Sequence, residues 1–116
     1  MSKLYDNFKF DLEVGMVAEE LLRDVLDNKK IEVKWDFMAP ETGNVYIEYQ
    51  YMGKPSGISK TEADYYCIRI GEVMHMISTG ELKNRCRKYV GTKRDVEGGD
   101  DGLTRGILLP IKELMK

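Results

Sequence analysis

Apolar and polar residues alternate along two short segments of the chain, one at residues 31–37 and one at residues 45–51. Because successive side chains of a strand point to opposite faces, this alternation predicts two strands, each with one apolar and one polar face. Asp36 lies on the polar face of the first segment, and Glu48 and Gln50 lie on that of the second. We expect the two strands to pair through the short turn between them, so that both carboxylates converge on one polar face.

Upstream, apolar residues recur at helical spacing over residues 11–27 and predict a first helix. Its apolar stripe consists of Val14, Val17, Ala18, Leu21, Leu22 and Val25. Glu19 lies beside this stripe, whereas Glu20 points more fully to solvent. An active-site residue is expected at the edge of the packed face, so Glu19 is the candidate. An ordinary surface glutamate is the alternative.

Turn residues and apolar runs predict further elements after the second strand. They are a short helix through residues 62–66, one or two strands within 66–78, a helix over 81–89, a loop over 95–101, a buried strand over 107–111 and a helical stub over 112–116. This order predicts an α/β fold with a mixed central β-sheet flanked by helices. The length of 116 residues fits a single domain, residues 1–116.

Composition excludes several functional classes. Hydrophobic residues make up 42% and charged residues 33% of the chain, which is ordinary for a soluble globular protein. No apolar run reaches the length of a membrane span, and residues 3–10 are too polar for a signal peptide, so a cytoplasmic location without membrane contact is expected. Cys67 and Cys86 form no CxxC pair and His75 is the only histidine, which argues against a zinc site and favours free thiols.

Basic residues are concentrated late in the chain, although the net charge is −2. Six of the 18 lysines and arginines lie within 12 positions, namely Lys83, Arg85, Arg87, Lys88, Lys93 and Arg94. Such a cluster suits contact with a phosphate backbone. A solvated helix face is the alternative.

The predicted pair of carboxylates suits a hard divalent cation, because Mg²⁺ prefers oxygen ligands and usually takes one or two protein carboxylates. A helical glutamate, an aspartate on one strand and Glu-x-Gln on the next strand together resemble the PD-(D/E)xK nuclease superfamily. The stretch GMVAEELL at residues 15–22 resembles the Gly-x-x-Ala-Glu opening of archaeal Holliday-junction resolvases, and residues 42–68 are similar to small phage-encoded members. The resemblance covers about the first two thirds of the chain and implies a restriction-endonuclease-like core.

The resemblance implies a metal-dependent DNA endonuclease that hydrolyses phosphodiester bonds. Asp36 and Glu48 would bind Mg²⁺ or Mn²⁺, with the backbone carbonyl of Tyr49 as a further ligand. Glu19 would complete the site directly or through a bound water. The chain departs from the superfamily at Gln50, where lysine is commonest, since glutamine can hold a water but supplies no charge.

Lys34 is the favoured replacement for that lysine, because it lies on the polar face of the first strand and can send its ammonium group into the site. Lys60 and Lys54 are the alternatives. The competing role for Lys34 is an ion pair with Glu32 or Glu48.

Contacts with nucleic acid are expected from basic residues outside the metal site, namely Lys60, Lys83, Arg85, Arg87 and Lys88. The chain is too short to include a separate DNA-reading domain, so recognition of DNA structure (a junction, flap or branch) is expected rather than recognition of sequence. A resolvase-like enzyme would act as a homodimer that cuts two strands symmetrically. Two other interpretations stay open: a catalytically inactive nuclease-fold module that binds nucleic acid or a protein, and an unrelated small α/β interaction protein.

Overall fold

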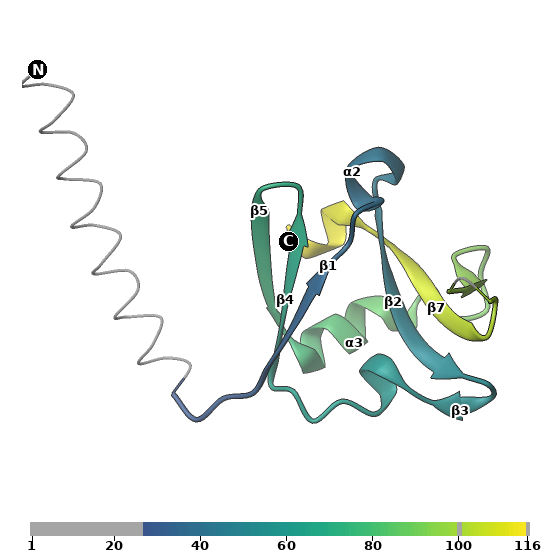
Figure 1. The fold of residues 1–116 in the computed structure, drawn as a ribbon, viewed down its shortest axis with the longest axis horizontal. Helices are drawn as coiled ribbons and strands as arrows, with labels where there is room; N and C mark the ends of the chain where they lie inside the picture. Colours follow the sequence, from purple (N-terminus) through teal and green to yellow (C-terminus); the bar gives the residue numbers. More distant parts are fainter. Residues whose placement is uncertain (1–26, 100, 116) are drawn as a thin grey trace, which may run out of the picture.

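The computed structural model describes residues 27–99 and 101–115, so most of the predicted first helix, with its Glu19, lies outside the described residues. The described part is a mixed α/β fold with two sheets and short helices (Figure 1). Its elements are β1 (Ile31–Trp35), α2 (Ala39–Thr42), β2 (Asn44–Tyr51), β3 (Lys54–Pro55), the 3-10 helix η1 (Gly57–Ser59), β4 (Tyr65–Ile70), β5 (Val73–Ser78), α3 (Thr79–Arg87), β6 (Asp95–Gly98), β7 (Thr104–Pro110) and the 3-10 helix η2 (Ile111–Leu114).

The described strands form two sheets rather than the single central sheet expected from the sequence. One sheet has the order β1-β4-β5 and the other has the order β3-β2-β7-β6. β1 runs parallel to β4, and β2 runs antiparallel to β7, so the prediction that the first two strands pair with each other is wrong.

The C-terminal strand β7 is the better partner for β2 because their apolar residues match in register. The buried pairs are Val45 with Leu109 and Ile47 with Ile107. Full burial of each such aliphatic side chain contributes about 1.5–3 kcal/mol. β1 cannot offer the same gain, because its alternate apolar residues Val33 and Trp35 are exposed.

One apolar core joins both sheets to α3, which packs against β4 and β5 (Figure 1). Its fully buried side chains include Val45 and Ile107 from one sheet, Ile68 from the other and Leu82 from α3. α3 begins after Ser78, whose Oγ accepts a hydrogen bond from the backbone N–H of Glu81 at 3.2 Å. The helix therefore starts two residues before the position predicted from the sequence.

Among the other predicted elements, the later strands agree with the structure, whereas one helix and one loop differ from it. The two strands within residues 66–78 are confirmed as β4 and β5, and the buried strand over 107–111 is confirmed as part of β7. The predicted helix through 62–66 is wrong, because Tyr65 already begins β4. The predicted loop over 95–101 begins instead with β6, which pairs with β7 and so satisfies its backbone groups there.

Cys67 and Cys86 are free thiols, as predicted, and both are buried. Burial raises the pKa of Cys86 to about 12, so its thiol stays protonated at neutral pH. Within residues 27–99 and 101–115, no helix combines the length and the apolar character needed to cross a membrane.

Candidate functional site

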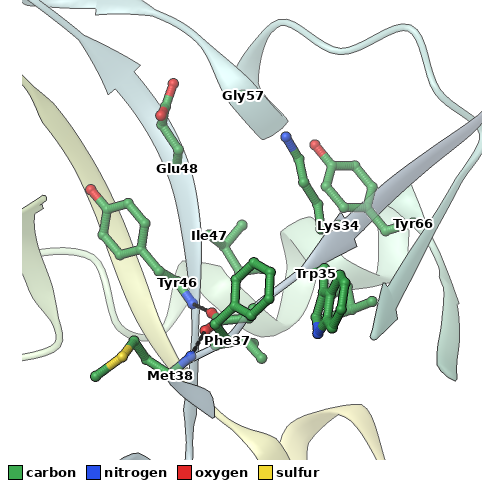
Figure 2. Close-up of a pocket in the computed structure, with 12 residues that line it drawn as sticks. Lys34, Trp35, Phe37, Met38, Tyr46, Ile47, Glu48, Gly57 and Tyr66 are labelled. Carbon is green, nitrogen blue, oxygen red and sulfur yellow. Dashed lines mark hydrogen bonds between the residues drawn. The ribbon is translucent and has the colours of Figure 1, made fainter. Parts of the chain in front are cut away.

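A cavity of about 360 Å³ is lined by residues of β1, β2 and β4 and of the short segments beside them. It brings together three of the predicted site residues, Lys34, Asp36 and Glu48. Figure 2 shows Lys34 and Glu48 extending from different strands at the same end of this cavity. The carboxylates therefore reach one cavity although β1 and β2 belong to different sheets.

Asp36 directly follows β1 and accepts three backbone hydrogen bonds. Its Oδ1 accepts from the N–H groups of Met38 at 3.1 Å and Ala39 at 3.0 Å. Its Oδ2 accepts from the N–H of Tyr46 at 2.9 Å, and dashed lines mark the bonds from Met38 and Tyr46 in Figure 2. These bonds hold the start of α2 and the start of β2 against the end of β1. Asp36 thus links the two sheets, and Oδ2 retains a second lone pair that faces no further N–H donor in the described part of the chain.

Glu48 is held from one side by the loop that follows β3. Its Oε2 accepts a hydrogen bond from Ser56 Oγ at 2.7 Å. The next residue, Gly57, has a φ of +51°, and a Cβ there would lie 2.2 Å from the backbone oxygen of Glu48. Only glycine permits this approach of η1 to β2. Glu48 Oε1 accepts no hydrogen bond from any described residue.

The carboxylates act electrostatically on two tyrosine hydroxyls of the cavity. Burial raises the pKa of Tyr66, and the negative charge of Glu32 raises it further, with a smaller effect from Glu48. Burial also raises the pKa of Tyr46, a hydrogen bond with Thr104 lowers it, and the charge of Glu48 raises it. Both hydroxyls are therefore protonated at neutral pH and can act as hydrogen-bond donors.

Glu32 lies beside the cavity and was not assigned to the site from the sequence. Its Oε1 lies 3.1 Å from the ammonium nitrogen of Lys34, so this lysine forms the ion pair that was considered as its competing role. Both side chains lie on the face of β1 that also bears Asp36, and Figure 2 shows the Lys34 ammonium beside the Tyr66 hydroxyl. The available signal was the spacing Glu32-Val33-Lys34, a Glu-x-Lys sequence on the first strand.

Gln50 does not share a face with Glu48, contrary to the prediction. In the pairing of β2 with β7, Glu48 lies opposite Gly106 and Gln50 lies opposite Arg105, so Tyr49 is an extra residue. Such a β-bulge turns the following side chain to the other face of the strand. Gln50 is therefore absent from the lining of the 360 Å³ cavity formed by the described residues.

The carbonyl of Tyr49, predicted as a metal ligand, accepts a hydrogen bond from the backbone N–H of Ser56 at 3.1 Å. The Tyr49 side chain points into a separate polar cluster, where its hydroxyl donates to Asp95 Oδ1 at 2.7 Å. Neither group of Tyr49 belongs to the cavity lining among the described residues.

The predicted nucleic-acid-binding residues fall into two groups. Arg85 pairs with Glu81 at 2.9 Å and also donates to the backbone carbonyl of Glu113. Lys88 pairs with the buried carboxylate of Glu113 at 3.0 Å, which ties α3 to η2. Arg85 and Lys88 are thus engaged in holding the fold together.

Lys83 and Arg87 lie one helical turn apart on α3 and line a second cavity of about 310 Å³. The lining of this cavity also includes the apolar side chains of Ile47, Ile58 and Ile107. Neither Lys83 nor Arg87 forms an ion pair with a described residue. Lys60, at the end of η1, is exposed. Of the five predicted nucleic-acid-binding residues, these three form no ion pair with a described residue.

Within the described part of the chain, no three His, Cys, Asp or Glu side chains are grouped closely enough to hold a metal ion. The acidic groups that the structure places at the 360 Å³ cavity are Asp36 and Glu48, with Glu32 beside it. Glu19, the third predicted ligand, lies outside the described residues.

Comparisons with protein-family models, with curated proteins and with solved structures found no match for this chain. The inference of function therefore rests on the two cavities and on the side chains that line them.

Proposed function

We propose that the protein is a Mg²⁺- or Mn²⁺-dependent DNA endonuclease with a restriction-endonuclease-like core, and that its active site is the cavity lined by Lys34, Asp36 and Glu48. One observation carries this proposal: two carboxylates and an ammonium group line a single cavity, although they come from the end of β1 and from β2, which belong to different sheets. Carboxylate oxygens are the donors that Mg²⁺ and Mn²⁺ prefer, so the donor set fits the proposed ion.

Asp36 Oδ2 and Glu48 Oε1 are the atoms available to hold the cation, since each has acceptor capacity left after its hydrogen bonds. A bound cation of this type polarises the scissile phosphate and lowers the pKa of its water. The ammonium of Lys34, held by Glu32, would bind a phosphate oxygen and stabilise the charge that develops there. Gln50 has no part in this scheme, because the bulge turns it away from Glu48.

The proposed substrate is branched DNA, such as a junction or flap, bound through its backbone by Lys60, Lys83 and Arg87. Their positions on η1 and α3 support contact with phosphates without providing a helix that reads bases. The proposed active form is a homodimer, because a single cavity of this kind cuts one strand at a time.

The second candidate is a nuclease-fold module that binds nucleic acid or a protein without cutting. The observation that favours it is the set of three backbone N–H bonds accepted by Asp36, which gives this carboxylate a structural role of its own. An acidic residue that accepts backbone hydrogen bonds at the start of α2 and of β2 would be retained even if catalysis were lost.

Incubation of labelled DNA with EDTA, Mg²⁺ or Mn²⁺ distinguishes these candidates. The substrates are linear duplex, single strand, flap and four-way junction. Glu48→Gln is the decisive variant, because it removes one charge while the hydrogen bond from Ser56 can persist. Glu72→Gln, at an exposed turn between β4 and β5, is the matched control.

For the nuclease we expect metal-dependent cutting by the wild type and by Glu72→Gln, and a loss of about a hundredfold or more in Glu48→Gln, since metal-borne stabilisation is worth several kcal/mol. Circular dichroism would verify that both variants are folded. Cutting that survives in Glu48→Gln would remove this cavity from the mechanism. No cutting by folded wild type with either metal, together with salt-sensitive DNA binding, would establish the binding module instead.

A further inference from the structure

The three-stranded sheet has an apolar face turned away from the core. The strand register puts the following side chains on this outer face: Ile31, Val33, Trp35, Cys67, Met74 and Met76. Val33 is 64% exposed, Met74 53% and Trp35 49%, although all three are apolar residues of strands. The same sheet buries Tyr66 and Ile68 on its inner face, so it is apolar on both sides.

Little in the described part of the chain covers the outer face. The guanidinium of Arg69 lies 3.8 Å from the centre of the Trp35 ring, and the ring of Phe37 stacks on Trp35 at 4.3 Å. Phe37 is itself 69% exposed, so it enlarges the apolar surface rather than shielding it. A contiguous apolar surface on a sheet is expected to be covered by another element, because exposure of this area to water is costly.

We propose that residues 11–27 of the same chain form an amphipathic helix that packs its apolar stripe on this outer face. The stripe supplies six apolar side chains at helical spacing, and an amphipathic helix buries such a stripe against another element of the fold. The other side of the helix bears Glu20 and Arg23, which suit exposure to water.

The connection between this segment and β1 supports docking within one chain. Asn28 has a φ of +61°, the left-handed conformation that commonly ends a helix and reverses the chain. Only residues 28–30 separate the proposed helix from Ile31, and connections from a helix to a strand are commonly about two to six residues long. The short tether keeps the stripe near the outer face at a high effective concentration, which favours it over a second copy of the chain.

Trp35 allows a direct test, because it is the only tryptophan of the chain and the strand register puts it on the outer face, at the edge where it also borders the 360 Å³ cavity. The measurements are the emission maximum of the full chain and its quenching by acrylamide over a range of protein concentrations. We expect emission at short wavelength, weak quenching and no dependence on concentration. Emission like that of tryptophan in water would overturn the proposal, and so would protection that appears only with dimers in sedimentation.

Two double variants then identify the covering element. Leu21→Gln/Leu22→Gln breaks the stripe, whereas Glu20→Gln/Arg23→Gln makes the same number of changes on the opposite side of the helix. We expect the first to shift Trp35 emission to longer wavelength and increase quenching, and the second to leave both unchanged. If the stripe variant does not fold, the milder Leu22→Ala replaces it. The proposal would be overturned if the folded stripe variant and the folded control variant showed the same Trp35 emission maximum and the same quenching. The test needs neither metal nor DNA, so its outcome is independent of nuclease activity.

Discussion

Asp36 is both a candidate metal ligand and a structural acceptor for backbone N–H groups of α2 and β2. Replacement by alanine leaves the N–H groups of Met38, Ala39 and Tyr46 without this acceptor. A typical hydrogen bond of this kind contributes about 0.5–1.5 kcal/mol net, and Asp36 accepts three of them. We therefore expect Asp36→Ala to lower the free energy of unfolding by about 1–3 kcal/mol in urea titrations.

Glu48→Gln provides the comparison, because the Glu48 carboxylate accepts one side-chain hydrogen bond and no backbone hydrogen bond from the residues that the structure describes. It should change the free energy of unfolding by about 0.5 kcal/mol or less, which is the range usual for substitutions that create no cavity and break no buried network. Equal stability of Asp36→Ala and the wild type would show that the three hydrogen bonds are not important for the fold. The difference also means that lost activity in Asp36→Ala cannot be assigned to metal binding alone.

Asp95 is a buried carboxylate whose charge stabilises the folded state. Burial by itself raises the pKa of Asp95. The hydrogen bonds from Gly91 and Tyr49 and the charge of Arg105 outweigh that effect, so the pKa lies below its ordinary value. A carboxyl group with a lower pKa in the folded state stabilises the protein above its unfolded pKa, about 3.9, and this contribution is lost as the pH falls through the folded pKa.

We expect Asp95→Asn to lower the free energy of unfolding by about 1–2 kcal/mol at pH 7 and by progressively less below about pH 4. Urea titrations at a series of pH values measure both quantities. Glu97→Gln, an exposed carboxylate on the same strand, is the control and should show little effect at any pH. A loss of stability in Asp95→Asn that is the same at pH 3 and pH 7 would contradict the role of the charge.

At the scale of elements, the sequence predicted individual strands well and their partners poorly. Alternation identified β1 and β2, because that pattern reports which face is apolar. It could not predict that Val45 pairs with Leu109, since this choice depends on residues more than sixty positions later in the chain. The β-bulge at Tyr49 was equally invisible, because Val45-Tyr46-Ile47-Glu48-Tyr49-Gln50 alternates regularly in the sequence.

The candidate site was likewise predicted in its individual residues but not in the strand pairing that brings them together. Asp36, Glu48 and Lys34 were predicted and do line one cavity, because alternation holds from Lys34 to Asp36 and, in β2, as far as Glu48 before the bulge. The two strands do not form the predicted hairpin. Instead, the Asp36 carboxylate accepts a hydrogen bond from the backbone N–H of Tyr46 and so connects the end of β1 to β2. Gln50 was assigned to the wrong face, for the one reason that a bulge changes the alternation.

The contact between η1 and β2 depends on Gly57, whose Cβ position would be 2.2 Å from the backbone oxygen of Glu48. Gly71 is the matched control, because its φ of +60° is similar but nothing lies within 4 Å of its Cβ position. Gly71→Ala should cost about 1–2 kcal/mol for the left-handed backbone alone. Gly57→Ala adds a backbone clash and should cost about 1–3 kcal/mol more in thermal or urea unfolding. Equal losses in the two variants would show that η1 can shift away from β2.

For the whole molecule, the question is how a chain with a net charge of −2 would approach a polyanion. The structure divides the basic cluster, since Arg85 and Lys88 neutralise acidic groups of the fold while Lys83 and Arg87 line the second cavity. Local charge rather than net charge would then govern binding, because fields from exposed charges are screened beyond about 8 Å at physiological salt.

The salt dependence of DNA binding tests this division. Each lost phosphate contact reduces the slope of log affinity against log salt by about 0.9 for duplex DNA. We therefore expect Lys83→Ala and Arg87→Ala each to flatten the slope by about 0.9, and the double variant by about 1.8. Lys112→Ala removes one exposed positive charge from η2 and should leave the slope unchanged. Fluorescence anisotropy at several salt concentrations measures these slopes. The same slope for all four variants would mean that Lys83 and Arg87 contact no phosphate and that α3 presents a solvated helix face.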